Sequence, residues 1–380
     1  MRKPLRHGYT TGACAAAAAK GAALMLARQE AATDVVIDLP AGVSASFTLH
    51  GQESGPGSAA CFVIKDAGDD PDVTNGAEVH ARVSLTPAIS QGEREQIITI
   101  TGGTGIGRAT KPGLAVAPGE WAINPVPRRM IDEAVREVFP QGGVRVEVSI
   151  PDGEERAMKT LNARLGIVGG LSILGTSGIV RPISAKAWTD TIDAALDVAR
   201  ACGSATVVLS TGRTSEMAAQ RQFDVRCSMF DVEDQEPGTS NLEPPPEPLP
   251  EEAYVMMGDH VAHALAACVQ RGFDRPIIAC QFAKLLKIAC GHGNTHAVAS
   301  ELDLSRLRTW AEGAHLPAPL RAIISRAHTA REIALESGFD RALLEVVCSH
   351  ARIAAYGHAP GTRAEFLVAD YAGNSVYYSG

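Results

Sequence analysis

The sequence predicts two domains: an α+β domain over residues 1–155, followed by an α/β, Rossmann-like parallel-sheet domain over residues 156–380. The first observation is length, because 380 residues exceed what one typical domain contains. The second is a change of rhythm along the chain. Strand-like runs dominate the first part, whereas strands and helices alternate in the second, and such alternation is typical of a parallel sheet with crossover helices.

The first domain is predicted to begin with a helix. Thr10, Thr11 and Gly12 precede the alanine-rich residues 13–27, so hydroxyl groups suited to capping stand directly before strong helix formers. Asn124 and Pro125 signal a second helix, since a cap residue is followed there by a proline in the first turn. Runs of strand-forming residues are expected at 35–39, 46–49, 61–64, 79–85, 96–101 and 144–150.

The second domain is predicted from alternating runs. Strands are expected at residues 165–168, 206–209, 254–257 and 276–280. Helices are expected at about 184–201, from about 215, at 260–270, and in the helix-rich sequence up to about 337, before an extended tail at 365–378. Residues 233–252 are rich in proline and glutamate and can bury very little, so we expect an exposed insertion there.

Composition excludes several classes of protein. The formal net charge is −8, and an acidic surface repels the phosphates of nucleic acids. The eight cysteines stand singly without a CxxC pair, which favours reduced thiols in a cytosol. The sequence contains no run of 18 apolar residues, and the alanine stretch interrupted by Lys20 is too weakly hydrophobic for an export signal. We therefore expect a soluble, cytoplasmic protein that binds neither nucleic acid nor membranes.

A glycine-rich segment at residues 102–107 follows a predicted strand. A helix should come next if this were a dinucleotide-binding loop, but residues 108–120 contain two prolines and two glycines within them, so that context is missing. Two interpretations remain open. The segment is either a glycine-rich hairpin or bulge, or a loop that contacts an anionic ligand through Arg108 and Lys111.

The segment from Lys65 to Asp72 places four carboxylates in seven residues just after a strand. Its spacing is not that of a calcium-binding loop, and Pro71 stiffens the chain where such a loop must wrap around the ion. An aspartate-rich turn that caps its own backbone is one interpretation. A second is a metal site for Mg²⁺ or Ca²⁺ on these oxygen-rich side chains. The third is a functional loop in which a carboxylate acts as a base or orients a substrate.

Two further loops are predicted to form one ligand-binding crevice. Residues 166–178 are rich in glycine and follow the first strand assigned to the parallel sheet, and residues 210–214 follow the next strand. Ligands bind beyond the carboxyl ends of the strands in open α/β sheets, where glycines let a nucleoside lie against the backbone. A tight structural turn is the alternative for the first of these loops.

The segment Gly291 to His296 follows a predicted helix that contains Lys284 and Lys287. Its two histidines stand four apart, but the intervening glycine and asparagine favour a loop, and a carboxylate at hydrolase spacing is missing. A loop that hydrogen-bonds a ligand and an ordinary glycine-terminated helix end both fit. The sequence assigns no role to Thr295 or His296. Searches for a serine nucleophile elbow, a Walker loop and an HExxH motif find none.

Five ordered blocks of this sequence resemble the cobalt-precorrin-5B C1-methyltransferase family. They are HGYTTGACAAAAAKGA at 7–22, KDAGDDPDVT at 65–74, GGTGIGRATKPGL at 102–114, INPVPRRMI at 123–131 and LGIVGGLSILGTSGIVRPIS at 165–184. The likeness runs from about residue 6 to about residue 300. It implies S-adenosylmethionine as methyl donor, a cobalt-containing tetrapyrrole as acceptor, with cobalt present only as part of that substrate, and a place in the anaerobic route to cobalamin (vitamin B12). A homo-oligomer is compatible with it.

Site residues are predicted from these blocks and from the two crevice loops. Catalytic roles are assigned to Asp66 and Asp70, and no residue is assigned to a metal. Contacts with the tetrapyrrole are assigned to Thr10, Thr11, Arg108, Lys111 and Arg128, since basic groups suit a carboxylate-fringed ring. Contacts with the donor are assigned to Gly169, Gly170, Gly175, Thr176, Gly178, Thr211 and Gly212.

Two other functions stay open at this point. One is a Mg²⁺-dependent phosphoryl-transfer enzyme that uses Asp69, Asp70 and Asp72 for the metal and the glycine loops for phosphates. The other is a non-catalytic corrinoid carrier within a biosynthetic complex. Nucleotide binding that depends on Mg²⁺ would identify the first, and tight corrinoid binding without affinity for S-adenosylmethionine would identify the second.

Overall fold

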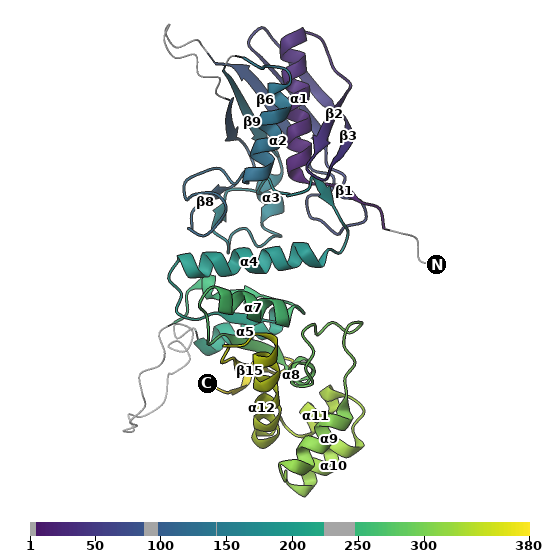
Figure 1. The fold of residues 1–380 in the computed structure, drawn as a ribbon, viewed down its shortest axis with the longest axis vertical. Coiled ribbons are helices and arrows are strands. Elements are labelled where there is room, and N and C mark those ends of the chain that lie inside the picture. The colour runs from purple at the N-terminus through teal and green to yellow at the C-terminus, as the bar shows by residue number, and fades with distance from the viewer. Residues whose placement is uncertain (1–4, 87–97, 142, 224–247) are drawn as a thin grey trace. The chain divides into compact units, whose positions relative to one another are not determined.

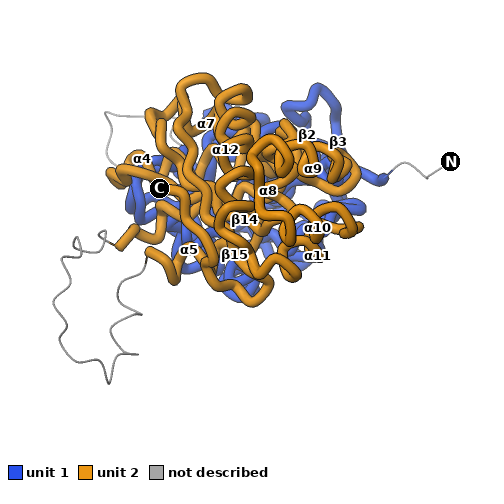
Figure 2. The backbone as a smooth tube through the Cα atoms, turned by 90° about the horizontal axis from the view of Figure 1, so that it is seen from below, with its two compact units in different colours: residues 1–184 blue, residues 185–380 orange. Residues whose placement is uncertain are grey.

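A computed structural model describes residues 5–86, 98–141, 143–223 and 248–380. The chain divides into two compact units, Met1–Ser184 and Ala185–Gly380, which Figure 2 draws in blue and orange. We call them unit 1 and unit 2. The division therefore falls about thirty residues after the boundary at 155 that the sequence predicts. Both units are mixtures of helix and strand.

The main sheet of unit 1 has five strands in the order β4-β5-β6-β9-β7. Neighbouring strands are antiparallel except for β7 and β9, which are parallel. Alternate residues of the strands are buried, as in β6, because one face of the sheet packs on the core. The strands are β4 (His50–Ser54), β5 (Ser58–Ile64), β6 (Glu78–Leu85), β7 (Ile98–Gly102) and β9 (Val144–Ser149). A separate antiparallel pair joins β2 (Asp34–Leu39) to β3 (Val43–Thr48).

Two helices, α1 (Thr11–Arg28) and α2 (Pro125–Arg136), pack side by side against this sheet (Figure 1). The alanines of α1 are almost all fully buried, because small side chains let the helix backbone approach the strands closely. Both helices begin where the sequence predicts, after Thr10 and after Asn124. A short helix, α3 (Gly153–Ala157), follows β9.

Two very short strand pairs hold residues 156–184 within unit 1. Strand β1 (Gly8–Tyr9) pairs with β11 (Ile179–Val180), and β8 (Arg108–Ala109) pairs with β10 (Ile167–Val168), both antiparallel. The predicted strand at 165–168 therefore exists, but its assignment to the parallel sheet of the second domain is wrong. Its partner lies almost sixty residues earlier in the chain, and local sequence patterns carry no information about such a distant partner.

The sheet of unit 2 has five strands in the order β13-β12-β14-β15-β16. The first four are parallel and β16 is antiparallel to β15. Their apolar residues are buried on both faces, which is typical of a parallel sheet covered by helices. The strands are β12 (Val208–Ser210), β13 (Tyr254–Met256), β14 (Ile277–Gln281), β15 (Glu365–Ala369) and β16 (Ser375–Tyr378).

Helices cover both faces of this sheet. One face packs against α5, and its core includes Val208, Ala219 and Ala279. The other face carries a larger core to which α4, α7, α8 and α12 contribute. The helices are α4 (Ala185–Ala201), α5 (Arg213–Phe223), α7 (Val261–Gln270), α8 (Phe282–Ala289), α9 (Leu304–Gly313), α10 (Ala318–Arg326), α11 (Ala330–Glu336) and α12 (Arg341–His358), with the 3-10 turn η1 (Glu251–Ala253).

Two predictions for the second half need comment. The sequence prediction omits α12, although Asp340 caps it and its apolar residues recur on one face. The predicted Pro/Glu-rich insertion at 233–252 lies outside the described residues up to 247, and of the rest Glu251 and Glu252 begin η1. Among the helices that the structure describes, none is long and apolar enough to cross a membrane.

Candidate functional site

Three segments of unit 1 that are far apart in sequence meet at the N-terminus of α1. Tyr9 N donates a hydrogen bond to Asp66 O (2.8 Å), and Thr10 N donates to Gly178 O (3.0 Å). The segments are residues 6–12, 65–76 and 174–183. They bring together six residues to which the sequence assigns different roles: contact with the tetrapyrrole for Thr10 and Thr11, catalysis for Asp66 and Asp70, and contact with the donor for Gly175 and Gly178.

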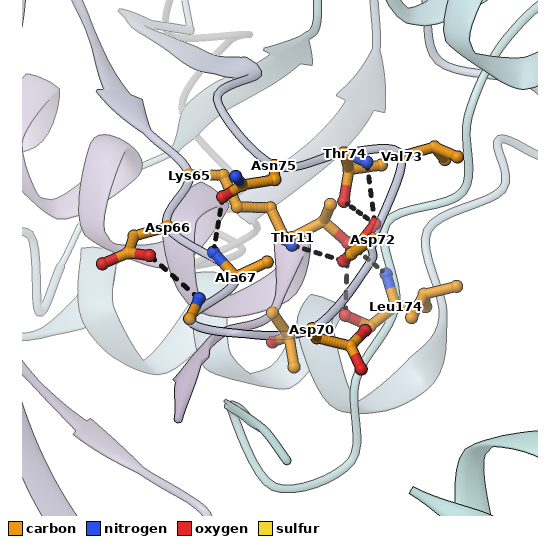
Figure 3. Close-up of polar contacts among 12 residues, drawn as sticks. Thr11, Lys65, Asp66, Ala67, Asp70, Asp72, Val73, Thr74, Asn75 and Leu174 are labelled. Atoms are coloured by element: carbon orange, nitrogen blue, oxygen red, sulfur yellow. Dashed lines mark hydrogen bonds and ion pairs between the residues drawn. The ribbon is translucent and has the colours of Figure 1, made fainter. Parts of the chain in front are cut away.

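The two threonines act as local anchors. Thr10 caps α1, because its hydroxyl accepts a hydrogen bond from Ala13 N (3.2 Å). Thr11 Oγ1 accepts from Leu174 N (3.0 Å) and donates to Leu174 O (3.3 Å), and this contact is visible in Figure 3. Both threonines are buried, so their hydroxyl groups fix the backbone of the third segment.

Asp66 forms a two-pronged ion pair with Arg6 at the surface. Both guanidinium nitrogens of Arg6 donate to its carboxylate, and Gly68 N donates to Asp66 Oδ1 (2.9 Å). The hydrogen bond from Arg6 is the main reason why the pKa of Asp66 lies below its usual value. Half of the Asp66 side chain remains exposed, so a ligand can still reach the carboxylate.

Asp70 lies in the same loop and faces the third segment. Its Oδ1 accepts a hydrogen bond from Ile183 N (2.9 Å), and its second carboxylate oxygen accepts none from the residues that the structure describes. Its neighbour Asp69 accepts from Arg6 N (2.7 Å). The aspartate-rich segment thus caps backbone groups, as in the turn interpretation, and it also leaves the Asp66 carboxylate half exposed and Asp70 partly exposed.

A buried ion pair holds this loop on its inner side. This pair was not predicted from the sequence. Lys65 Nζ donates to Asp72 Oδ2 (2.6 Å), while Thr74 N and Oγ1 both donate to Asp72 Oδ1 (2.7 and 2.6 Å). Burial alone would raise the pKa of Asp72, but the charge of Lys65 and these hydrogen bonds outweigh it and hold the pKa below its usual value. Figure 3 shows the pair inside the loop.

The sequence contains a signal for the buried lysine. In β5 the inward-facing positions are Ala59, Cys61 and Val63, and Lys65 continues the same alternation two residues later. A lysine at an inward position requires a carboxylate partner, because an isolated buried charge is very costly. The sequence pattern therefore indicates a buried ion pair, although it does not choose among the four aspartates.

Most glycines assigned to the donor meet neighbouring chain segments. A Cβ atom on Gly175 would lie 2.5 Å from the side chain of Thr10, and one on Gly170 would lie 2.3 Å from Gly105. A Cβ on Gly178 would lie 2.9 Å from Leu39. Close chain packing thus accounts for these three glycines. Gly169 differs, because a Cβ there would meet nothing within 4 Å, and Thr176 has an exposed side chain.

The basic residues assigned to the tetrapyrrole lie elsewhere in unit 1. The guanidinium of Arg108 stacks on the ring of Trp121, 3.9 Å from its centroid, and donates to Gly119 O (2.7 Å). Lys111 Nζ lies 3.4 Å from Arg164 O. Arg128 donates to three main-chain carbonyls, so it fixes the loop before α2. Arg108 keeps an exposed side chain beside these contacts.

The second predicted loop lies in unit 2, directly after β12. Thr211 N donates to Ala279 O (3.0 Å), which ties the loop after β12 to the middle of β14. A Cβ on Gly212 would meet no atom of the described residues within 4 Å, so these residues leave the space beside this backbone open. Ser210, at the end of β12, has a buried hydroxyl without a hydrogen-bond partner among the described residues. The prediction that this loop and residues 166–178 follow neighbouring strands of one sheet is wrong.

A polar network that the sequence left without a role follows β13 and β14. Lys284 Nζ forms an ion pair with Asp259 and donates to Thr295 O (3.0 Å). Lys287 Nζ donates to the same carbonyl (3.1 Å), and Thr295 Oγ1 donates to Asp259 Oδ1 (2.7 Å). Burial alone would raise the pKa of Asp259, but hydrogen bonds from Lys284 and Thr295 outweigh it and lower this pKa.

Metal-ligand clusters are missing from the described part of the chain. No group of three or more His, Cys, Asp or Glu side chains there is arranged to hold an ion. In the acidic loop, Asp69 already accepts a hydrogen bond from a backbone amide, and Asp72 accepts one from Lys65.

Comparison with known proteins decides the family. A protein from Pelobacter propionicus named cobalt-precorrin-5B C(1)-methyltransferase is 65% identical over 378 residues, which cover 99% of this chain and 96% of that protein. The chain belongs to the cobalt-precorrin-5B C(1)-methyltransferase family. A relative of the same name from Geobacter metallireducens is 56% identical over 99% of each chain. The family model described as CbiD matches residues 1–182.

One solved structure is also similar in sequence. It is the 1.9 Å crystal structure of cobalamin biosynthesis protein (cbiD) from Archaeoglobus fulgidus, which is 31% identical. The match covers 75% of this chain and 79% of that chain, with a TM-score of 0.37. The family match covers four of the five sequence blocks in full and the fifth up to residue 182, so the resemblance seen in them is confirmed, and the protein is a methyltransferase of cobalamin biosynthesis.

Proposed function

We propose that this protein transfers a methyl group from S-adenosylmethionine to C1 of cobalt-precorrin-5B, giving cobalt-precorrin-6A. The observation that carries this proposal is the 65% identity, over nearly the full length of both chains, to a relative with that name. The identity extends through both units, so it covers each loop discussed above. S-adenosylmethionine is the donor we infer from the family resemblance.

The reaction takes place between the two ligands and needs no covalent bond to the protein. The ring carbon of the acceptor forms a bond to the methyl carbon, the bond between that methyl and the sulfonium breaks, and its electron pair stays on sulfur. S-adenosylhomocysteine leaves as a neutral thioether. The protein must hold the two reacting carbons about 3 to 3.5 Å apart and exclude water, which removes much of the entropic barrier. The cobalt belongs to the substrate.

We assign the methyl donor to unit 2 because of the strand order of its sheet. The order β13-β12-β14-β15 corresponds to second, first, third and fourth in sequence, which is one of the two common strand orders of doubly wound α/β sheets. In such sheets a ligand binds beyond the carboxyl ends of the strands where the order reverses, here between β12 and β14. Thr211 and Gly212 lie in this position. The open space beside Gly212 and the unpartnered Ser210 hydroxyl both suit a bound ligand.

The acceptor is assigned to unit 1. Arg108, which is exposed, and Lys111, which is partly buried, would bind carboxylates of the ring through charge-assisted hydrogen bonds. Asp66 has a half-exposed carboxylate, and Asp70 has one oxygen that accepts no hydrogen bond from the described residues; we assign both residues catalytic roles beside the ring. Thr10, Thr11 and Arg128 act by positioning the surrounding backbone. Gly169 and Thr176 remain candidates for ligand contact, since neither is fixed by packing as Gly170, Gly175 and Gly178 are.

The test is product formation by the full-length protein. Purified protein incubated with cobalt-precorrin-5B and S-adenosylmethionine should convert the corrinoid to a species heavier by one methyl group and release one equivalent of S-adenosylhomocysteine. Mass spectrometry with a donor carrying a labelled methyl group identifies the transfer. Tight corrinoid binding without methylation would support the carrier alternative instead, and turnover of a nucleotide that requires Mg²⁺ would support phosphoryl transfer.

A further inference from the structure

The network of Asp259, Lys284, Lys287 and Thr295 has more positive charge than its internal contacts require. Asp259 follows β13, and both lysines lie on α8, which begins directly after β14. The two strands flank β12, so the network lies at the same end of the sheet as Thr211 and Gly212. Two ammonium groups therefore share one carbonyl and one carboxylate at this end.

An ordinary structural role explains Lys284 but leaves Lys287 unexplained. The ion pair with Asp259 connects the loop after β13 to α8, and Thr295 is held in place by the same carboxylate. Lys287 forms no ion pair with any described residue, and its one hydrogen bond goes to Thr295 O. Burial and the neighbouring charge of Lys284 lower the pKa of Lys287, so its ammonium form is less favoured than that of an ordinary exposed lysine.

The two lysines also have N–H donors that their hydrogen bonds within the network do not use. An ammonium group has three N–H donors. Lys284 uses two of them, toward Asp259 and Thr295, and Lys287 uses one. Three donors remain on two adjacent cations, and a carboxylate of a ligand has two oxygens that accept such bonds. An anion here would also relieve the repulsion between the two ammonium groups.

We propose that Lys284 and Lys287 bind a carboxylate group of a ligand of this enzyme, and that Asp259 and Thr295 are positioning residues that hold Lys284. This inference rests on the proposed function, because both ligands of that reaction carry carboxylates. One source is the amino-acid carboxylate of S-adenosylmethionine, and the other is the carboxylate fringe of the tetrapyrrole.

The test variant is Lys287→Gln, which removes the charge without leaving Asp259 unpaired. Calorimetry measures the affinity for S-adenosylmethionine and for its decarboxylated analogue, and initial rates give KM for cobalt-precorrin-5B. If the donor supplies the carboxylate, we expect Kd for S-adenosylmethionine to rise about tenfold while that for the decarboxylated analogue stays unchanged. If the acceptor supplies it, KM for the corrinoid should rise about tenfold at unchanged donor affinity.

Two controls separate charge from folding. Lys287→Arg keeps a cation and should retain most of the binding, and Lys186→Gln removes an exposed lysine on α4 that pairs only with Asp190 in the described structure and should change neither constant. Folded Lys287→Gln protein with both ligand constants unchanged would overturn the inference while the methylation activity stands. Wild-type protein that binds neither ligand would overturn the proposed function and this inference together.

Discussion

Lys65 Nζ lies 2.6 Å from Asp72 Oδ2, and the lysine side chain is only 1% exposed. This ion pair fixes the inner side of the loop whose outer side carries Asp66 and Asp70. The second oxygen of Asp72 is occupied by Thr74, so the carboxylate has hydrogen-bond partners on both oxygens. The loop that we assign to catalysis is therefore held by a buried charge pair, which makes its conformation sensitive to changes at residues that no ligand needs to touch.

Replacing Lys65 with methionine should destabilise unit 1. The change keeps an unbranched apolar chain of similar length, but it leaves Asp72 without a counterion. Removing one partner of a buried ion pair typically costs about 3 to 5 kcal/mol of stability. We expect the lower value, about 3 kcal/mol, because 23% of the Asp72 side chain is exposed and water can partly solvate its charge. Urea denaturation followed by circular dichroism measures the free energy of unfolding.

The matched control is the double variant Lys65→Met with Asp72→Asn. An asparagine can still accept the hydrogen bonds from Thr74 and carries no charge to leave unpaired. We expect this double variant to recover part of the lost stability. A double variant less stable than Lys65→Met alone would contradict the assignment of the cost to an unpaired carboxylate.

Acid should weaken the folded state through Asp72. Its folded pKa lies below the ordinary value of 3.8, so the carboxylate contributes stability that is fully present above that value and is lost as the pH falls through the folded pKa. We expect the free energy of unfolding to fall as the pH is lowered from about 5 to about 3. In the Lys65→Met variant, Asp72 should contribute less to this loss of stability. An equal loss in the variant and in the wild-type protein would mean that other carboxylates cause it.

The sequence was informative where structure is local. Helix α1 begins where Thr10 caps alanine-rich sequence, and α2 begins after Asn124 and Pro125, because caps and propensities act within a few residues. The alternation of strand and helix after α4 likewise yields parallel strands. These signals depend only on neighbours in the chain, so a single sequence contains them.

The boundary between the units could not be read in this way. Strands β10 and β11 are two residues long and pair with Arg108–Ala109 and Gly8–Tyr9, so their place in unit 1 depends on distant partners. Thr10, Asp66 and Gly175 lie in three predicted blocks, and their proximity results from the same pairings. Lys65 is different, because the inward alternation of β5 marks it in the sequence itself.

Valine at Gly175 should reduce stability before it affects ligand binding. A Cβ there would lie 2.5 Å from three atoms of Thr10, and φ of +124° is a conformation that side-chain-bearing residues rarely adopt. Overpacking and backbone strain together should cost about 2 kcal/mol. Thermal unfolding measures the loss, and Gly57→Val, where a Cβ meets nothing within 4 Å, is the control. Wild-type stability with weakened donor binding would instead make Gly175 a ligand contact.

Gly212→Val should have the opposite effect: it should weaken donor binding and leave stability unchanged. Its Cβ would meet no atom within 4 Å, so the fold should tolerate the change. In our proposal the donor lies beside this backbone, and an added side chain should raise Kd for S-adenosylmethionine about tenfold, equivalent to about 1.4 kcal/mol. Calorimetry against Gly57→Val measures the effect. Unchanged donor affinity in a folded Gly212→Val protein would remove this loop from the donor site.

Asparagine at Asp66 tests the catalytic assignment, because the change keeps the size of the side chain and removes its charge. The pair with Arg6 is half exposed, and such surface pairs contribute less than about 1 kcal/mol, so folding should be preserved. If the carboxylate acts on the reacting ring, turnover should fall about a hundredfold while both ligands still bind. Asp69→Asn is the matched control within the same loop, since Asp69 accepts its hydrogen bond from Arg6 N and is assigned no catalytic role. Equal turnover of Asp66→Asn, Asp69→Asn and wild-type protein would leave Asp66 with only its structural contacts to Arg6 and Gly68.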